Sequence, residues 1–300
     1  MDYTARKQQL LAELRQYTDL RIEISEDGQD DERVLSVLEA FLEPYRKQAD
    51  LSSFWLSFLL DELSEQEVMR GMRLYHLRET AAAAVFLLYF PQGYDETVME
   101  ILSGLSGGSD RLLNLDETHL LLLRLPRGVL SIENLRETAL TMADTLSADA
   151  MIPVHISYDS CVEELSALPQ SFRNAKLAET CGLLFSSAEH IHPYHELGLG
   201  KLVSKLSIDD CREYLADHLG NFRFDTLDAE LSATVHAFFD AGLSIAETAR
   251  NLFIHRNTLV YRLDKFEKLS GLDLRNFDDA VTAKLAMLME VYCSEAASRV

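Results

Sequence analysis

The chain has 300 residues, of which 47% are hydrophobic and 26% are charged. This length predicts two or three domains, and this composition is ordinary for a soluble globular protein with a sizeable core. The formal net charge of −21 excludes a protein that binds nucleic acid or an anionic membrane over its whole surface, because phosphates are repelled wherever positive charge is not concentrated.

The cysteines and the N-terminal residues indicate the cellular compartment in which the protein is expected. Cys161, Cys181, Cys211 and Cys293 lie far apart, with no CxxC pair and no zinc-finger spacing, so we expect buried, reduced side chains. The first 17 residues lack the apolar segment of a signal peptide, and the longest apolar run, residues 81–90, is too short to cross a bilayer. We therefore expect a cytoplasmic protein with no membrane contact, no cofactor and no bound metal.

Residues 1–75 have the pattern of a helical region. Leu10, Leu14 and Tyr17 predict a first helix, and apolar residues between 34 and 42 predict a second. Pro44 predicts that the second helix bends or restarts there. The dense apolar patch at 54–60 favours a helix buried in the core or against a partner subunit over a ligand site.

Residues 76–206 alternate strand and helix patterns. Residues 81–90 predict a strand buried on both faces. After it we expect a helix at 96–106, a hairpin at 111–126, a helix at 132–146, a strand at 151–159, a helical segment at 161–181 and a short strand at 183–187. This order predicts a ferredoxin-like or cyclase-like α/β layer, with helices covering one side of the sheet.

Residues 244–269 carry two apolar stripes at helical spacing. Ile245, Ala249 and Leu252 form the first stripe, and Leu259, Leu263 and Phe266 form the second. Only residues 253 and 254 separate the stripes, so the two helices must turn sharply and pack on each other. This is the pattern of a helix-turn-helix, whose second helix, about 256–269, enters the DNA major groove. The alternative is a solvated amphipathic helix pair.

The face opposite the second stripe is basic and rich in hydrogen-bond donors. It carries His255, Arg256, Asn257, Tyr261, Arg262, Lys265 and Lys268. From residue 244 to residue 275 there are six Lys or Arg and four Asp or Glu, a difference of +2. Contact with double-stranded DNA is therefore expected to be local to this segment.

The run LFIHRNTLVYRL is informative beyond its helical periodicity. With Leu231, Thr234, Val235 and Phe238 on the helix before it and Gly271 after it, the run resembles the C-terminal DNA-binding domain of the PucR/CdaR regulators of purine catabolism and sugar diacids. Phe253, where many other helix-turn-helix proteins place Gly, fits that family. The resemblance implies a DNA-reading role for His255, Arg256, Asn257, Thr258, Tyr261 and Arg262.

The resemblance covers roughly residues 50–295 and implies that the central domain is a degenerate GGDEF-like domain. In active cyclases of that group, the hairpin turn carries two glycines, followed by acidic residues that help to hold Mg²⁺. The turn at 114–118 has neither glycine, and Leu115 would block close approach of a phosphate to the backbone. Asp116 and Glu117 are therefore interpreted as a polar hairpin tip, and no enzyme activity is predicted.

The segment HIHPYHELGLG offers a second site to consider. His190, His192, His195 and Glu196 are metal-ligating residue types, but their spacing is loose. The resemblance explains the segment better, since a Tyr-x-x-Leu-Gly motif, here Tyr194, Leu197 and Gly198, commonly closes the central domain of the family.

The sequence therefore predicts a mostly α-helical, multidomain protein. Its expected parts are an N-terminal helical region at 1–75, a GGDEF-like α/β domain at 76–206, a linker at 207–225 and a helix-turn-helix domain at 226–300. The predicted function is that of a sequence-specific transcriptional regulator with a small-molecule effector, binding DNA as a homodimer or higher even oligomer. The alternative is a nucleotide-binding or enzymatic α/β domain with a helical assembly tail.

Overall fold

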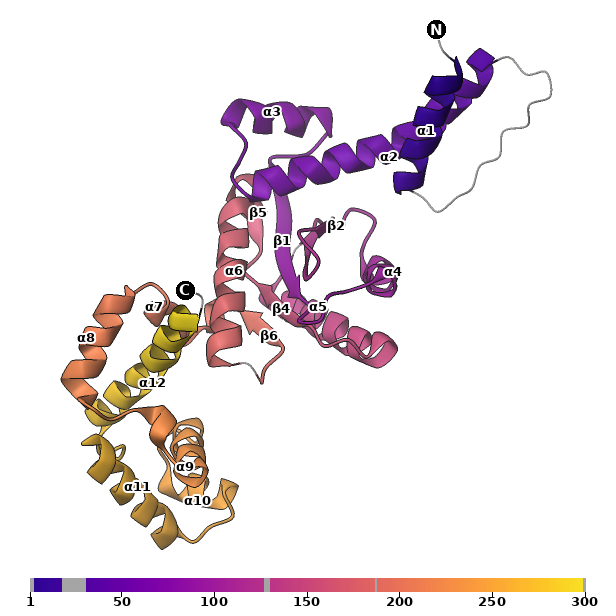
Figure 1. Cartoon of the computed structure of the whole chain (residues 1–300). Helices are drawn as coiled ribbons and strands as arrows, with labels where there is room; N and C mark the ends of the chain where they lie inside the picture. Colours follow the sequence, from indigo (N-terminus) through magenta and orange to yellow (C-terminus); the bar gives the residue numbers. More distant parts are fainter. Residues whose placement is uncertain (1–2, 18–30, 127–129, 187, 299–300) are drawn as a thin grey trace.

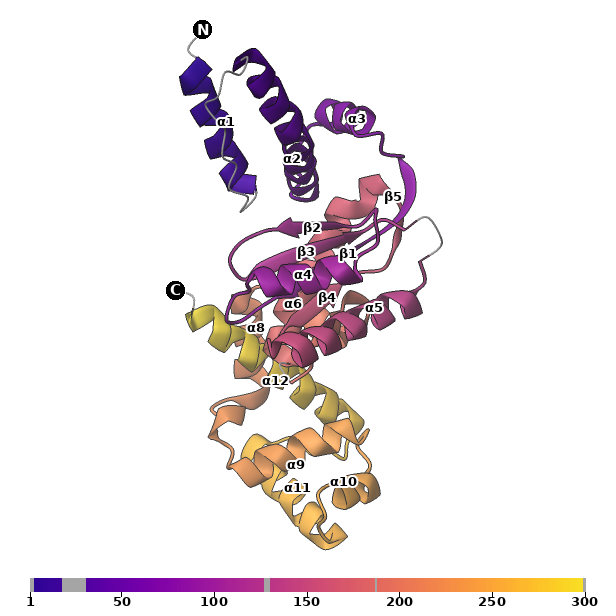
Figure 2. The same ribbon diagram turned by 90° about the vertical axis from the view of Figure 1, so that its right-hand side faces the viewer.

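The computed structural model describes residues 3–17, 31–126, 130–186 and 188–298. These residues form a pair of N-terminal helices, a central layer built on one sheet, and a group of C-terminal helices. Figures 1 and 2 show the N-terminal pair and the C-terminal group at opposite ends of the molecule. Among the described residues, no helix is long and apolar enough to cross a membrane.

The helices before the sheet are α1 (Tyr3–Tyr17), α2 (Asp31–Leu59) and α3 (Glu65–Leu74), of which α1 and α2 form the N-terminal pair. Leu10 and Leu14 of α1 are buried against Leu38 and Leu42 of α2. The predicted restart at Pro44 is wrong, because α2 continues through this residue. Proline removes one backbone hydrogen bond, and the exposure of Pro44 leaves the freed carbonyl group accessible to water.

The sheet has six strands, and β1 lies at its centre. Its strands are β1 (Thr80–Tyr89), β2 (Arg111–Asn114), β3 (His119–Arg124), β4 (His155–Tyr158), β5 (Val162–Glu164) and β6 (Ile191–Pro193). The order is β2-β3-β1-β4-β6, and β5 pairs with the beginning of β1. Strand β1 is antiparallel to both β3 and β4, whereas β6 is parallel to β4.

Three helices connect and cover these strands: α4 (Glu96–Leu105), α5 (Ile132–Thr145) and α6 (Leu168–Phe185). The path β1-α4-β2-β3-α5-β4, with order β2-β3-β1-β4, is the split βαβ arrangement of the predicted ferredoxin-like layer. A π-helical turn, Leu146–Ala150, extends α5, and a 3₁₀ turn, Leu165–Ala167, leads into α6.

Helices cover both faces of the sheet, so the expectation of helices on one side is wrong. Phe86 and Leu88 of β1 pack in a cluster with Val98 of α4 and Leu135 of α5. Val85 and Leu87, which point to the opposite face, pack in a second cluster with Trp55 of α2 and Phe172 of α6. The apolar run of β1 requires this cover, because both sets of alternating side chains must leave water. In the patch at 54–60, Trp55, Phe58 and Leu59 are thereby core, whereas Leu60 is 42% exposed.

The strand expected at 183–187 is absent from the described residues, because Leu183–Phe185 complete the last turn of α6. A short apolar run cannot be assigned to strand or helix by periodicity alone. Phe185 lies against Gly200, where an added Cβ would lie 2.7 Å from its ring. The edge position of the sheet is taken instead by β6, through the pairs Ile156 with Ile191 and Ser157 with His192.

The C-terminal helices are α7 (Gly198–Val203), α8 (Ile208–Leu219), α9 (Ala229–Asp240), α10 (Ile245–Asn251), α11 (Arg256–Ser270) and α12 (Phe277–Ser298). Helix α12 is shared by two apolar clusters. Ala283 and Met287 join the cluster built by α9 and α11, while Ala286 packs with Cys211 of α8. The segment expected as a linker, 207–225, therefore contains a helix whose apolar face is packed against α12.

A row of aromatic and imidazole rings crosses the sheet on the side of α6. Tyr89 of β1 stacks on His119 of β3 at 5.0 Å between centroids and lies 6.2 Å from His155 of β4. His155 Nδ1 is 3.1 Å from Nε2 of His192 on β6. His192 is only 3% exposed, and this burial, with the neighbouring His155 and His190 rings, lowers the pKa of His192 to about 4. Burial also lowers the pKa of His155.

These histidines predict how stability depends on pH. The folded state holds His192 neutral, so the unfolded state binds more protons between pH 6.5 and about 4, and stability falls as pH is lowered through this range. His192 alone should contribute a loss of about 2 kcal/mol between pH 7 and 5. Urea unfolding of the His192→Asn variant should show a weaker pH dependence, with His155 supplying the remainder. Equal slopes in the variant and the wild type would contradict this assignment.

Candidate nucleic-acid interface

Helices α10 and α11 are joined by a tight, hydrogen-bonded turn. The Ser244 hydroxyl caps α10 by accepting the Glu247 N–H. At the other end of α10, the Phe253 N–H donates to the Arg250 carbonyl at 3.1 Å and the Ile254 N–H donates to the Ala249 carbonyl at 3.0 Å. The sharp turn predicted between the two apolar stripes is confirmed.

The second apolar stripe fixes the rotation of α11 about its axis. Leu259, Leu263 and Phe266 are at most 1% exposed, and they pack with Val235 and Phe238 of α9. Burial of side chains of this size contributes roughly 1.5 to 3 kcal/mol each. Because these residues face α9 and α12, the side chains on the opposite face of α11 must point to solvent.

The N-terminal turn of α11 is the exposed end. His255 is the N-cap, and its Nδ1 accepts the Asn257 N–H at 3.2 Å. Arg256, Asn257 and Thr258 are exposed, and Tyr261 is 69% exposed. Backbone N–H groups at a helix N-terminus attract phosphate, while Arg and Asn side chains match the major-groove edges of guanine and adenine. In Figures 1 and 2, this end of α11 lies far from the sheet.

Two of the predicted DNA-binding residues form ion pairs with acids at the start of α9. Arg262 is 15% exposed; its Nη1 donates to Thr234 Oγ1 at 3.1 Å, and its Nη2 pairs with Glu230. Lys265 Nζ lies 2.6 Å from Asp228 Oδ2, and its hydrogen bond lowers the pKa of Asp228. To bind a DNA phosphate, either side chain would first have to break its ion pair with Glu230 or Asp228.

The last basic residue of the segment is fully engaged with acids. Arg275 contacts Asp264 at 2.7 Å, Glu267 at 2.8 Å and Asp273 at 2.6 Å, and the hydrogen bond with Asp273 raises its pKa. It thereby ties the end of α11 to the loop before α12. Six basic residues lie between 244 and 275. Among the described residues, four of the six form ion pairs, and only Arg256 and Lys268 do not.

Comparison with known proteins assigns this arrangement to a family. Residues 231–289 match the PucR C-terminal helix-turn-helix domain. The end of the chain is a PucR-type helix-turn-helix domain. A purine catabolism regulatory protein of Bacillus subtilis is 28% identical over 146 residues, which are 48% of this chain and 28% of that protein. A carbohydrate diacid regulator of Escherichia coli is 32% identical over 124 residues, 41% of this chain and 32% of its own length.

A third relative matches over a longer stretch. AdeR of Bacillus subtilis, a DNA-binding transcriptional activator, is 23% identical over 188 residues, 58% of this chain and 42% of that protein. The resemblance to the PucR/CdaR regulators is confirmed by these matches. The chain spans about a third of the length of the first two relatives.

Outside the PucR-type domain, the hairpin between β2 and β3 has its Asp116 carboxylate occupied by hydrogen bonds. Asp116 Oδ1 accepts the backbone N–H groups of Thr118 at 2.7 Å and His119 at 2.9 Å. His119 also bridges Asp116 and Glu179, with Nε2 3.2 Å from Glu179 Oε1. Partial burial would raise the pKa of Asp116, but these hydrogen bonds hold it well below its usual range. The carboxylate organises the turn, as the interpretation of a polar hairpin tip predicts.

The histidines of the second considered site divide into two groups. His190 and His192 both lie beside His155, while His195 lies 3.6 Å from Glu196, which binds Arg136 at 2.7 Å. Across the described part of the chain, no group of three or more His, Cys, Asp or Glu side chains has the geometry of a metal site.

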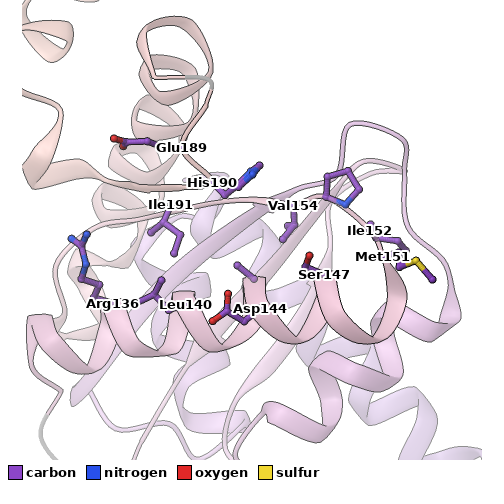
Figure 3. Close-up of a pocket in the computed structure, with 12 residues that line it drawn as sticks. Arg136, Leu140, Asp144, Ser147, Met151, Ile152, Val154, Glu189, His190 and Ile191 are labelled. Carbon is purple, nitrogen blue, oxygen red and sulfur yellow. The ribbon is translucent and has the colours of Figure 1, made fainter. Parts of the chain in front are cut away.

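A cavity of about 660 Å³ lies beside the edge strand β6, between α5 and residues 151–154. Figure 3 shows Arg136, Leu140 and Asp144 along α5, with His190 and Ile191 facing them from the other side. This volume and mixture of apolar and polar walls suit a small organic molecule.

The sequence did not indicate that α9 binds Arg262 and Lys265. Acids in the first turn of a helix are expected from its dipole, so Asp228 and Glu230 gave no separate signal. Their pairing partners lie 37 and 32 residues away and are brought together only by the packing of α9 on α11.

The difference in burial between Arg262 and Arg256 predicts different effects of their substitution on stability. Arg262→Ala removes a largely buried side chain and its hydrogen bond to the buried Thr234, so it should lower the free energy of unfolding by about 1 to 1.5 kcal/mol. Arg256→Ala, at an exposed position, should change it by less than about 0.5 kcal/mol. Urea unfolding of the two variants would measure this, and equal stabilities would show that Arg262 is not a structural anchor.

Proposed function

We propose that this protein is a sequence-specific transcriptional regulator that reads the DNA major groove with α11 of its PucR-type domain. The observation that carries the proposal is the exposed, donor-rich N-terminal turn of α11, formed by residues 255–258, on a helix whose opposite face is buried. His255, Arg256, Asn257, Thr258 and Tyr261 are the proposed base and phosphate contacts. Arg262 and Lys265 contribute mainly by holding α11 in place.

The proposed organisation is the one expected from the sequence, with parts at 1–75, 76–206, 207–225 and 226–300. Separate apolar clusters around α1, β1 and α9 support three parts, while Trp55 and Met72 join the end of the first part to the core of the sheet. The βαββαβ path supports a GGDEF-like origin for the central domain. The missing glycines and the occupied Asp116 carboxylate support an inert version of that domain, with a structural or sensory role.

A regulator of this kind works on DNA in the bacterial cytoplasm, and we place the protein there. A helix-turn-helix reads a pseudo-palindromic operator by presenting two recognition helices about one turn of DNA apart. A homodimer or a higher even oligomer is therefore part of the proposal. A small-molecule effector is also proposed, and the cavity between α5 and β6 has the size and the mixed lining to bind one.

The reading role of α11 predicts the effect of two substitutions. Arg256→Ala and Asn257→Ala should each cost about 1 to 3 kcal/mol of binding to an operator mapped by genomic footprinting. Arg212→Ala on α8, which removes an exposed basic side chain outside the proposed interface, is the matched control and should bind as wild type. Binding isotherms of each variant on operator and random duplexes would measure these losses of binding free energy. Wild-type affinity in both α11 variants would contradict the proposal.

The second candidate function is nucleotide turnover by the central domain, which the acidic hairpin favours. A cyclase would convert GTP in the presence of Mg²⁺, but Asp116 already binds Thr118 and His119. We expect no product above a control without protein. If product formed and the Asp116→Ala variant lost it, the hairpin would be an active site and the inert assignment would be wrong.

A further inference from the structure

Phe253 occupies an unusual position for an aromatic residue. It is 96% exposed, the highest value among the large apolar side chains of the described residues. Its φ of +55° lies in the left-handed region, which a residue with a Cβ rarely adopts. Glycine would fit this turn without strain, so the turn geometry does not explain the phenylalanine.

Backbone hydrogen bonds of the turn fix the point from which this side chain projects into solvent. The Phe253 N–H is bonded to the Arg250 carbonyl, and the next residue, Ile254, is bonded to Ala249 and packs against the domain core. Phe253 precedes Arg256 by three residues, so both belong to the same end of the domain. The backbone that carries the ring is therefore held in a fixed place beside the proposed recognition turn.

The surroundings of Phe253 favour DNA over protein as its partner. The next exposed side chains are Arg250, His255, Arg256 and Asn257, all polar. A protein interface has an apolar core built from several residues, and one ring among cationic and amide groups does not supply it. The ring has no hydrogen-bonding group, so on a base edge it can recognise only an apolar feature. In the major groove that feature is the C5-methyl group of thymine.

Building on the proposed function, we infer that Phe253 reads a thymine methyl group at the edge of each half-site, beside the bases contacted by Arg256 and Asn257. The aromatic ring covers the methyl group and removes it from water. Phe253 thus adds a specificity contact from the turn to the hydrogen-bonding contacts from the helix. Its position outside α11 allows it to reach a base pair that the first turn of the helix does not cover.

The test uses the full-length protein and a footprinted operator in which each thymine is replaced, one at a time, by deoxyuridine. This change removes only the methyl group. Wild-type protein should bind about three- to tenfold more weakly at one thymine per half-site. Phe253→Gly, which suits the positive φ, should bind the unmodified operator more weakly by a similar factor and show no further loss with deoxyuridine at that site.

Two controls separate the possible outcomes. Arg256→Ala should bind weakly but keep the sensitivity to deoxyuridine, and Phe253→Gly should unfold at a temperature no lower than wild type. Absence of operator binding by wild-type protein would overturn the proposed function and this inference with it. Tight binding that is insensitive to deoxyuridine, or equally sensitive in Phe253→Gly, would overturn the inference alone. So would a Phe253→Gly variant that loses affinity equally for all DNA sequences, which indicates contact with the sugar-phosphate backbone.

Discussion

The proposed interface depends on the packing of α11 against α9. Three buried side chains, Leu259, Leu263 and Phe266, fix which face of α11 is turned inward. Arg262 strengthens the same contact through Thr234 and Glu230. Since side chains on a helix rotate together, this single constraint decides that residues 256, 257 and 261 face solvent. A loss of the contact would disperse the donors that make the surface specific.

The charge of the domain is organised by the same contact. Acids on α9 and around Arg275 neutralise most of the positive charge in the middle and at the end of α11. What is left for DNA is the helix N-terminus with Arg256 and the more distant Lys268. In a chain of net charge −21, these groups form a small positive region on a molecule whose net charge repels phosphate. In the proposed function, such a protein gains little from non-specific attraction and relies on the proposed base contacts and the proposed two-fold arrangement of half-sites.

Helix α12 connects this interface with the remainder of the molecule. Met287 packs in the cluster around α11, whereas Met289 packs in the cluster that includes α8. Tyr292 donates to the Ser204 carbonyl at the end of α7, and Phe185 brings the last turn of α6 against Gly200. Packed side chains thus run without interruption from the sheet to the helix-turn-helix. Contiguous packing of this kind can carry coupling between the proposed effector site in the central layer and the helix-turn-helix.

The sequence by itself determined the local elements with strong periodicity. The stripes of α10 and α11, the buried strand β1 and the hairpin at residues 115–118 follow from side-chain spacing and turn chemistry, which act within a few residues. The run IHRNTL identified the PucR-type domain by its resemblance to that family.

Tertiary structure decided what depended on partners distant in sequence. The pairing of Arg262 and Lys265 with α9, the ring row across four strands and the packing of α8 on α12 join residues separated by tens of positions. The last turn of α6 was mistaken for a strand because three apolar residues fit either structure, and only the contact of Phe185 with Gly200 selects the helix. Periodicity shows which face of an element is apolar, whereas the element that packs against this face is determined by the fold of the whole chain.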